Sequence, residues 1–207
     1  RLEMVRYQIE ARGVTDPRVL EAMQVIPRHQ FVPEPYREAA YRDSPLPIGE
    51  GQTISQPYIV ALMTALLELR PGDMVLEIGT GSGYQAALLS RLAEKVFTLE
   101  RLPEVADRAR KNLAALGIEN VDVIVGDGTL GYQAQAPYQG IIVTACAPEI
   151  PAPLIAQLGD GGRLDAPVGS RDFQMLTKLV RHGENVERST FGGVAFVPLI
   201  GAYGWQE

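Results

Sequence analysis

Cysteine and histidine are scarce in this sequence, which limits the chemistry open to it. The 207 residues include one cysteine, Cys146, and two histidines, His29 and His182. A single cysteine excludes a disulfide within the chain, and these three residues offer no metal-binding cluster, so we expect no metal site. We interpret Cys146 as a small buried residue and not as a nucleophile, because no histidine lies close to it in the sequence.

Long apolar runs and an excess of positive charge are also missing. The longest apolar runs are far shorter than the roughly 20 residues of a membrane-spanning helix. The N-terminal segment mixes Leu2, Val5 and Ile9 with charged residues, which is typical of an amphipathic helix and not of a signal peptide. A formal net charge of -6 argues against nucleic acid as the main partner. We therefore expect a cytoplasmic protein that binds neither membranes nor nucleic acid.

The order of apolar segments predicts the fold class. A hydrophobic content of 46% in 207 residues is enough for one α/β domain. Four apolar runs alternate with segments of helical spacing, at residues 74–78, 95–100, 121–125 and 140–145. Three more predicted strands follow at 163–168, 174–181 and 193–199, with a hairpin turn at 182–185. The pattern predicts a Rossmann-like, mostly parallel sheet with helices on both faces and an antiparallel C-terminal hairpin.

Two short helices and a proline-rich segment are predicted ahead of the first of these strands. The first helix ends at Gly13, and the second begins with Asp16 as its N-cap and Pro17 as its first helical residue. In residues 28–53 several prolines and glycines leave little room for regular structure. The aromatic residues of this segment indicate that it is packed and not a floppy linker: Phe31, Tyr36 and Tyr41. A long ordered segment of this kind is usually functional.

The sequence G-Q-T-I-S-Q-P at residues 51–57 leads into a predicted apolar helix. We expect Ser55 to be the N-cap of this helix, with Pro57 in its first turn. A cap places its hydroxyl at the mouth of a helix beside free N–H groups, so a structural and a functional role for Ser55 are compatible.

A glycine loop follows the predicted strand at 74–78. Gly79, Gly81 and Gly83 stand at alternate positions before a predicted helix, where backbone N–H groups and the helix dipole can meet a ligand. The spacing G-x-G-x-G differs from the G-x-G-x-x-G of dinucleotide sites, and Glu77 stands two residues before the first glycine. The plain alternative is a glycine-rich turn with no ligand, so the interpretation depends on the residues downstream.

Acidic residues follow two later strands. Glu100 stands where an acid accepts hydrogen bonds from ribose hydroxyls in nucleotide sites, although a solvated carboxylate at a strand end is common. Asp127 precedes Gly128 and can reach an adenine amino group, although G-D-G is also an ordinary turn. Because the carboxyl ends of parallel strands share one edge of a sheet, we expect Gly79, Glu100 and Asp127 to lie there together.

The chain carries a set of short motifs that occur together in one family: D-S-P at 43–45, I-G at 48–49, G-Q-T-I-S-Q-P at 51–57, L-E-I-G-T-G-S-G-Y at 76–84, G-D-G at 126–128, A-P-Y at 136–138 and P-V-G at 167–169. Together they resemble the protein-L-isoaspartate O-methyltransferases, a protein-repair family of class I S-adenosylmethionine-dependent methyltransferases. The similarity runs from the first helix to Pro198-Leu199. Many methyltransferases share the glycine motif, whereas G-Q-T-I-S-Q-P is far more selective.

The resemblance implies transfer of the methyl group of S-adenosylmethionine to the free α-carboxylate of L-isoaspartyl residues in damaged proteins and peptides, with S-adenosylhomocysteine as product. It implies one methyltransferase domain over 1–207, in which 1–56 hold the N-terminal helices and active-site segment and 57–207 form the cofactor-binding core; we expect a monomer. Ser55 is implied as the active-site residue. The residues implied to bind the cofactor are Gln52, Thr53, Ile54, Ser55, Glu77, Gly79, Gly81, Ser82, Gly83, Glu100, Asp127 and Gly128.

The implied reaction requires few functional groups from the protein. The acceptor carboxylate is ionised at neutral pH, because its pKa is near 4, and needs no general base. The Ser55 hydroxyl suits a donor to one carboxylate oxygen, which positions the acceptor. Two departures from the family pattern are visible. No histidine follows the serine motif, and V-P-L-I at 197–200 replaces V-P-L-T, so any threonine contact there is lost.

Two other functions fit the sequence less well. A methyltransferase for RNA or a small molecule would share the glycine motif, but the acidic charge disfavours RNA and G-Q-T-I-S-Q-P disfavours both acceptors. A cofactor-binding module without catalysis would share the fold. The two departures above do not remove the groups that the chemistry needs, so this alternative ranks last.

Overall fold

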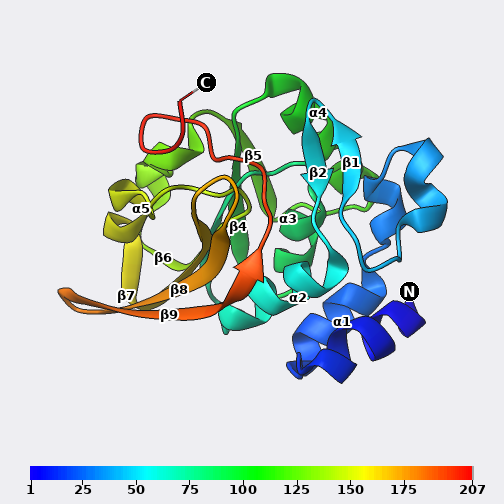
Figure 1. Cartoon of the computed structure of the whole chain (residues 1–207), viewed down its shortest axis with the longest axis horizontal. Coiled ribbons are helices and arrows are strands. Elements are labelled where there is room, and N and C mark those ends of the chain that lie inside the picture. Colours follow the sequence, from blue (N-terminus) through cyan, green and yellow to red (C-terminus); the bar gives the residue numbers. More distant parts are fainter. Residues whose placement is uncertain (207) are drawn as a thin grey trace.

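The chain folds around a seven-stranded sheet, which a computed structural model describes for residues 1–206 (Figure 1). The strand order is β5-β4-β3-β6-β7-β8-β9. Neighbouring strands from β5 to β7 are parallel, and β8 and β9 are added antiparallel. The predicted fold class is thereby confirmed. The strand bounds are β3 (Met74–Ile78), β4 (Lys95–Glu100), β5 (Val121–Val125), β6 (Tyr138–Val143), β7 (Leu158–Gly169), β8 (Gln174–His182) and β9 (Asn185–Val194).

The C-terminal hairpin forms where it was predicted, with His182 opposite Asn185. The prediction of a strand at 193–199 was wrong, because β9 ends at Val194 and the chain then leaves the sheet. Beyond that point the chain takes its backbone partners from Cys146, which follows β6. Cys146 N–H donates to the Val197 carbonyl at 2.8 Å, and Leu199 N–H donates to the Cys146 carbonyl at 2.7 Å. Glu207, the last residue of the expected domain, lies outside the described residues.

Helices cover both faces of the sheet, and each face has its own apolar core. The core beneath α1 to α3 includes Val75 and Val96, whereas the core on the side of α5 includes Leu76 and Phe97. Successive residues of a strand point to opposite faces, so neighbouring apolar residues enter different cores. Figure 1 shows α2, α3 and α4 on one side of the central strands and α5 on the other. The helix bounds are α1 (Pro17–Val25), α2 (Pro57–Leu66), α3 (Tyr84–Leu89), α4 (Pro103–Ala115) and α5 (Ala152–Ala156).

The N-terminal helices begin and end close to where the sequence predicted. A π-helical turn at Met4–Ile9 and a 3-10 turn at Glu10–Arg12 end at Gly13, which has a left-handed conformation with φ 96°. Asp16 is the N-cap of α1, and its carboxylate accepts hydrogen bonds from the backbone N–H groups of Arg18 and Val19.

The proline-rich segment is more regular than predicted. It contains 3-10 turns and an antiparallel hairpin formed by β1 (Leu46–Gly49) and β2 (Gln52–Ile54). Phe31 is buried, as expected for a packed segment, but Tyr36 is 41% exposed. Leu46 and Ile48 are buried on one face of β1, which holds the hairpin against the domain despite its prolines.

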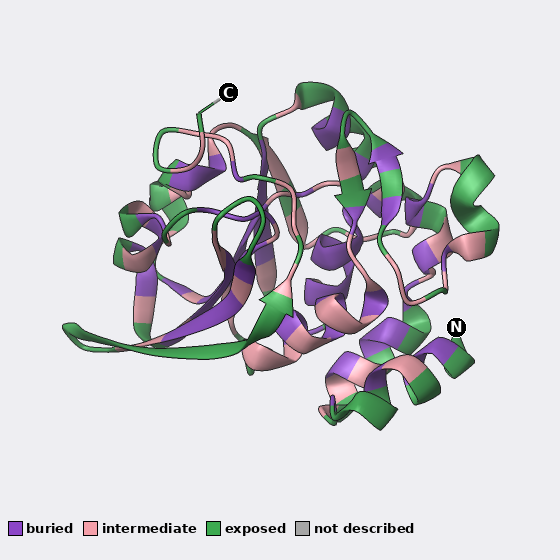
Figure 2. Cartoon of the chain, viewed as in Figure 1, coloured by how far each residue is buried: buried purple, intermediate pink, exposed green. Residues whose placement is uncertain are grey.

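Burial is uneven across the molecule (Figure 2). All six residues of α3 are buried, whereas nearly every residue of the edge strand β9 is exposed. In the described part of the chain, no helix combines the length and the apolar character needed to cross a membrane. The buried helix lies directly after the glycine loop, so that loop rests on a rigid support.

Candidate active site

Two adjoining cavities open at the carboxyl ends of β3, β4 and β6. They enclose about 640 Å³ and 440 Å³, their open mouths included, and both are lined by Gly79 and Gly81 of the glycine loop. Ligands of open α/β sheets bind at this edge. Most of the predicted site residues line one or both cavities: Gln52, Thr53, Ile54, Ser55, Glu77, Gly79, Gly81, Ser82, Glu100 and Gly128.

The glycine loop is held between the ends of β4 and β6. The N–H groups of Gly79 and Thr80 both donate to the Leu99 carbonyl, at 2.9 and 3.2 Å. On the other side the Thr144 hydroxyl donates to the Gly79 carbonyl at 2.6 Å. Gly79 has φ 96°, and a Cβ placed on it would collide with the Thr144 hydroxyl oxygen. This position therefore requires glycine for its conformation and for its close approach to Thr144.

Glu100 connects the end of β4 to the same loop. Its carboxylate is almost fully buried, and Oε2 accepts the Gly81 N–H at 3.0 Å while Oε1 accepts the Leu102 N–H at 3.1 Å. Two backbone donors fix the orientation of this carboxylate. Each oxygen keeps a second lone pair with which to accept a ligand hydroxyl from the first cavity.

Glu77 is fully buried and lines the second cavity. Neither of its carboxyl oxygens has a hydrogen-bond partner among the described residues. Burial raises the pKa of Glu77 from 4.5 to about 8, the nearby Thr98 hydroxyl opposes this effect, and the charge of Glu100 adds to it. Buried polar groups normally have partners. An unpartnered carboxyl at a cavity wall is therefore suited to a hydrogen-bond-donating ligand, and a cationic ligand would lower its pKa and favour its ionised form.

Ser55 lies where these cavities meet a third, outer cavity, and Thr53 and Phe196 line all three as well. The prediction that Ser55 is the N-cap of α2 was wrong. Pro57 is the first helical residue, so the N-cap is Gln56, and no side chain caps the helix. The position of Ser55 is consequently explained by the cavities and not by capping.

Among the described residues, two of the predicted ligands line neither inner cavity. Gly83 instead packs against Ala109 and Leu113 of α4. Asp127 accepts the Thr129 N–H and hydroxyl at 2.8 and 2.6 Å and the Ala202 N–H at 2.8 Å. Burial alone would raise the pKa of Asp127, but these hydrogen bonds hold it below its usual value. Contact of Asp127 with an adenine ring stays a prediction.

Sequence reasoning missed one wall of the first cavity, which residues 196–200 form. The indole N–H of Trp205 donates to the Cys146 carbonyl at 3.0 Å, and Ala202 is bound to Asp127, so this C-terminal segment is fixed across the strand ends. The V-P-L motif within it was visible in the sequence. The same reasoning missed Thr144, because a threonine after an apolar strand carries no distinctive signal.

The residues present fit S-adenosylmethionine. Glu77 offers an unpartnered carboxyl to the cationic end of such a ligand, and Glu100 offers acceptors for a ribose. Ile78 and Gly128 line the first cavity with Glu100, and a Cβ on Gly128 would collide with Ile78, so apolar surface and exposed backbone lie there beside the carboxylate. Within residues 1–206, no group of three or more His, Cys, Asp or Glu side chains is arranged to hold a metal ion.

Known proteins resemble the chain along its whole length. The family model described as protein-L-isoaspartate(D-aspartate) O-methyltransferase (PCMT) matches residues 1–204. A protein-L-isoaspartate O-methyltransferase from Methanoculleus marisnigri is 65% identical over 206 residues, covering 100% of this chain and 94% of its own length. The same-named protein of Methanospirillum hungatei is 59% identical over 207 residues, covering 100% and 96%.

Solved structures also resemble the chain. One protein-L-isoaspartate O-methyltransferase superposes with a TM-score of 0.89 and 31% identity, over 99% of this chain and 67% of that chain. A beta-aspartate methyltransferase (PCMT) from Plasmodium falciparum, in complex with S-adenosyl-L-homocysteine, shares the fold with a TM-score of 0.83 and 24% identity, over 96% and 97%. The chain belongs to the protein-L-isoaspartate (D-aspartate) O-methyltransferase family.

Proposed function

We propose that this chain is a protein-repair enzyme that transfers the methyl group of S-adenosylmethionine to the α-carboxylate of L-isoaspartyl residues in damaged proteins and peptides. The observation that carries the proposal is the position of Ser55, at the junction of the two inner cavities with an outer one, in a chain of this family. A methyl donor in the inner cavities and an acceptor in the outer one would meet beside this hydroxyl.

The residues have separate parts in the reaction. S-adenosylmethionine supplies a methyl group on a sulfonium sulfur; the acceptor oxygen forms the new C–O bond as the C–S bond breaks. Glu77, Glu100 and the glycine loop at 79–82 bind the methyl donor. Ser55 donates a hydrogen bond to one acceptor oxygen and so directs the other toward the methyl group. No base is needed, because a carboxylate is already ionised at neutral pH.

The remaining cofactor contacts are proposed from the same geometry. The strand β2 lines the inner cavities with all three of its residues, Gln52, Thr53 and Ile54. Ser82 lines the second cavity. The β1–β2 hairpin would exclude water from the site and help to hold the reacting atoms in position. The amide nitrogen of the following residue then attacks the methyl ester and expels methanol to form a succinimide, and hydrolysis of the succinimide returns part of the product to normal aspartate.

We further propose that the chain acts as a single methyltransferase domain, with 1–56 providing the helices and active-site segment and 57–207 the cofactor-binding core. Its partners are isoaspartyl-containing proteins and peptides. A net charge of -6 supports a protein that does not act on nucleic acid. We also propose that the enzyme is monomeric and cytoplasmic and has no membrane partner.

The test uses labelled S-adenosylmethionine and three peptides of identical sequence that carry isoaspartate, aspartate or alanine at one position. We expect base-labile label in the isoaspartyl peptide and at least about a hundredfold less in the aspartyl peptide, because a misplacement of about 1 Å can cost that much in rate. Equal labelling of the two acidic peptides would refute the repair function. Label in RNA or in a small molecule, with none in the peptides, would identify another acceptor.

A further inference from the structure

The outer cavity beside Ser55 contains features that the methyl transfer does not require. It encloses about 850 Å³, its open mouth included, between α2 and the ends of β8 and β9. Thr53, Ser55 and Phe196 line this cavity and both inner cavities. A chain lying in it would therefore reach the reacting atoms. We call this cavity the outer groove. Its lining is largely apolar: Pro45, Ile59, Val194, Ala195, Phe196 and Phe173.

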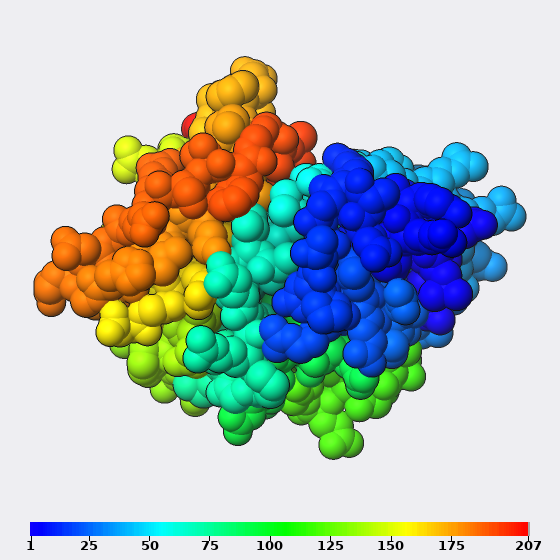
Figure 3. All heavy atoms as spheres, turned by 90° about the horizontal axis from the view of Figure 1, so that it is seen from below, coloured from blue at the N-terminus to red at the C-terminus, as the bar shows by residue number. Residues whose placement is uncertain are grey.

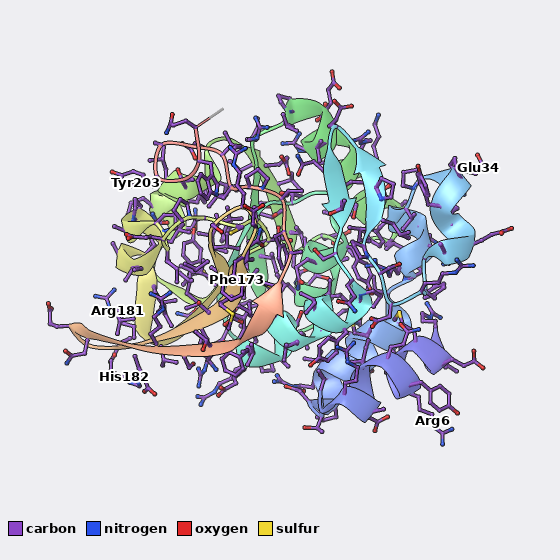
Figure 4. The ribbon with its side chains drawn as sticks, viewed as in Figure 1. Arg6, Glu34, Phe173, Arg181, His182 and Tyr203 are labelled. Carbon is purple, nitrogen blue, oxygen red and sulfur yellow. The ribbon has the colours of Figure 1, made fainter. Side chains whose placement is uncertain are left out.

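Phe173 is the unusual member of this lining. It is 69% exposed, although it borders a groove that leads to the active site. In the view of Figure 4 its label lies near the centre, away from those of Arg181 and His182 by the tip of the β8–β9 hairpin. In the view from below, the segment near residue 170 projects from the surface beside the residues that follow 190 (Figure 3). An exposed aromatic ring at the rim of a site is available to an incoming chain.

The turn that carries Phe173 is firmly held. The Ser170 hydroxyl accepts the N–H groups of Phe173 and Asp172 at 3.0 and 3.3 Å, and the Ser170 N–H donates to the Phe173 carbonyl at 2.9 Å. The backbone that carries the ring is therefore held in place before any ligand arrives, which lowers the entropic cost of a contact with the ring.

The opposite wall is fixed as well. The Gln174 side chain accepts the Phe196 N–H at 2.7 Å and donates to the Phe196 carbonyl at 3.0 Å. These paired bonds hold the backbone of Phe196 to the start of β8, next to the turn that carries Phe173. The groove is thus formed in advance of binding.

Asp172 is the one charged residue among those that line the groove. Its carboxylate has no ion-pair partner among the described residues, and the neighbouring Arg171 lies over the Trp205 ring, 5.4 Å from its centroid. The groove therefore presents apolar surface with a negative rim. This combination disfavours an acidic side chain next to the acceptor and tolerates a basic one.

From these observations we infer that the outer groove selects among isoaspartyl sites by their neighbouring residue: Phe173 binds an aromatic or large apolar side chain on one side of the isoaspartyl residue, and Asp172 disfavours an acidic one. The inference rests on the proposed function. It concerns which damaged sites are repaired fastest, and the occupant is the polypeptide that carries the acceptor.

The experiment measures kcat/KM for isoaspartyl peptides with alanine flanks in which Phe, Lys or Glu replaces alanine at each of two positions on either side. We expect Phe to raise kcat/KM about five- to tenfold over alanine on one side, the range that an aromatic pair produces. Phe173→Ala should remove most of this ratio, and Phe173→Leu should retain part of it. Asp172→Asn should reduce the preference for Lys over Glu by about two- to threefold at low salt.

A matched control is Phe191→Ala, because Phe191 is also exposed, at 42%, but lies on β9 outside the lining of the groove. It should leave every ratio unchanged. Calorimetric titration of the same peptides into the enzyme with S-adenosylhomocysteine provides a binding readout independent of turnover. A Phe173→Ala enzyme with the wild-type ratios, or equal losses in both variants, would overturn the inference. If wild-type enzyme methylates no isoaspartyl peptide, the proposed function fails and the inference with it; methylation without a flank preference defeats the inference alone.

Discussion

The Gly81 N–H donates to Oε2 of Glu100 at 3.0 Å, which joins the glycine loop to the end of β4. We therefore propose two roles for this carboxylate: it shapes the loop, and its remaining lone pairs accept ligand hydroxyls. Variants at this position separate the roles only if the loop and the ligand are measured independently.

Glu100→Ala should weaken S-adenosylmethionine binding by about 1 to 3 kcal/mol, the usual range for loss of hydrogen bonds to a charged group. The loop also loses an acceptor, so urea unfolding should show a lower free energy of unfolding. Glu100→Gln keeps one carbonyl acceptor. Its affinity for S-adenosylmethionine and its free energy of unfolding should therefore lie between those of the wild type and of Glu100→Ala. Calorimetry gives the affinity; an unchanged dissociation constant for Glu100→Ala would remove this residue from the site.

Ser55→Ala should lower turnover while leaving the free energy of unfolding within about 0.5 kcal/mol of the wild type, because Ser55 does not cap α2. Cofactor affinity should change less than turnover, because we propose that the hydroxyl donates a hydrogen bond to the acceptor. Ser189→Ala, at an exposed position of β9, is the control for the substitution itself. A loss of about 1 kcal/mol in stability with normal turnover would instead indicate a capping role.

Glu77 should make stability depend on pH. Its pKa is about 8 in the folded chain and near 4.5 when unfolded, so unfolding releases a proton between these values. The free energy of unfolding should therefore fall as pH rises through this window, by up to about 1.4 kcal/mol per pH unit, and level off above it. Glu77→Gln should lack this component, whereas Glu38→Gln, at an exposed position, should keep it. Urea titrations from pH 5 to 8 measure the difference; parallel curves for the wild type and Glu77→Gln would contradict the assignment.

Gly79→Ala should be severely damaging. The new Cβ meets the Thr144 hydroxyl oxygen, and φ 96° is unfavourable for alanine, so we expect a loss of at least about 2 kcal/mol and of cofactor binding. Gly72→Ala introduces a Cβ into open space and should be tolerated. Thr144→Ala combined with Gly79→Ala should recover part of the stability by removing the collision. Absence of any recovery would place the whole cost in the backbone conformation.

Local pattern was enough to predict the parallel strands, the glycine loop after β3 and the place of Glu100 at the end of β4, because strand periodicity and alternate glycines act within a few residues of each other. The two errors had different causes, one local and one distant. Ser55 was misassigned as a cap because Pro57 at the first helical position makes Gln56 the N-cap. Residues 195–199 look like strand, yet their backbone partner is Cys146, and Pro198 cannot donate to a ladder. The hydrogen bond from the Ala202 N–H to Asp127 could not be predicted either, because no local pattern connects the two residues; the ligand contact of Asp127 stays a prediction.

The C-terminal wall of the first cavity has a consequence for synthesis on the ribosome. Every strand of the sheet precedes residues 196–200, which complete the cavity, and Trp205 secures them still later. Because translation proceeds from the N-terminus, the sheet and the glycine loop emerge before this wall exists. A chain synthesised only as far as residue 195 therefore lacks this wall of the first cavity, although it already carries the residues of every strand.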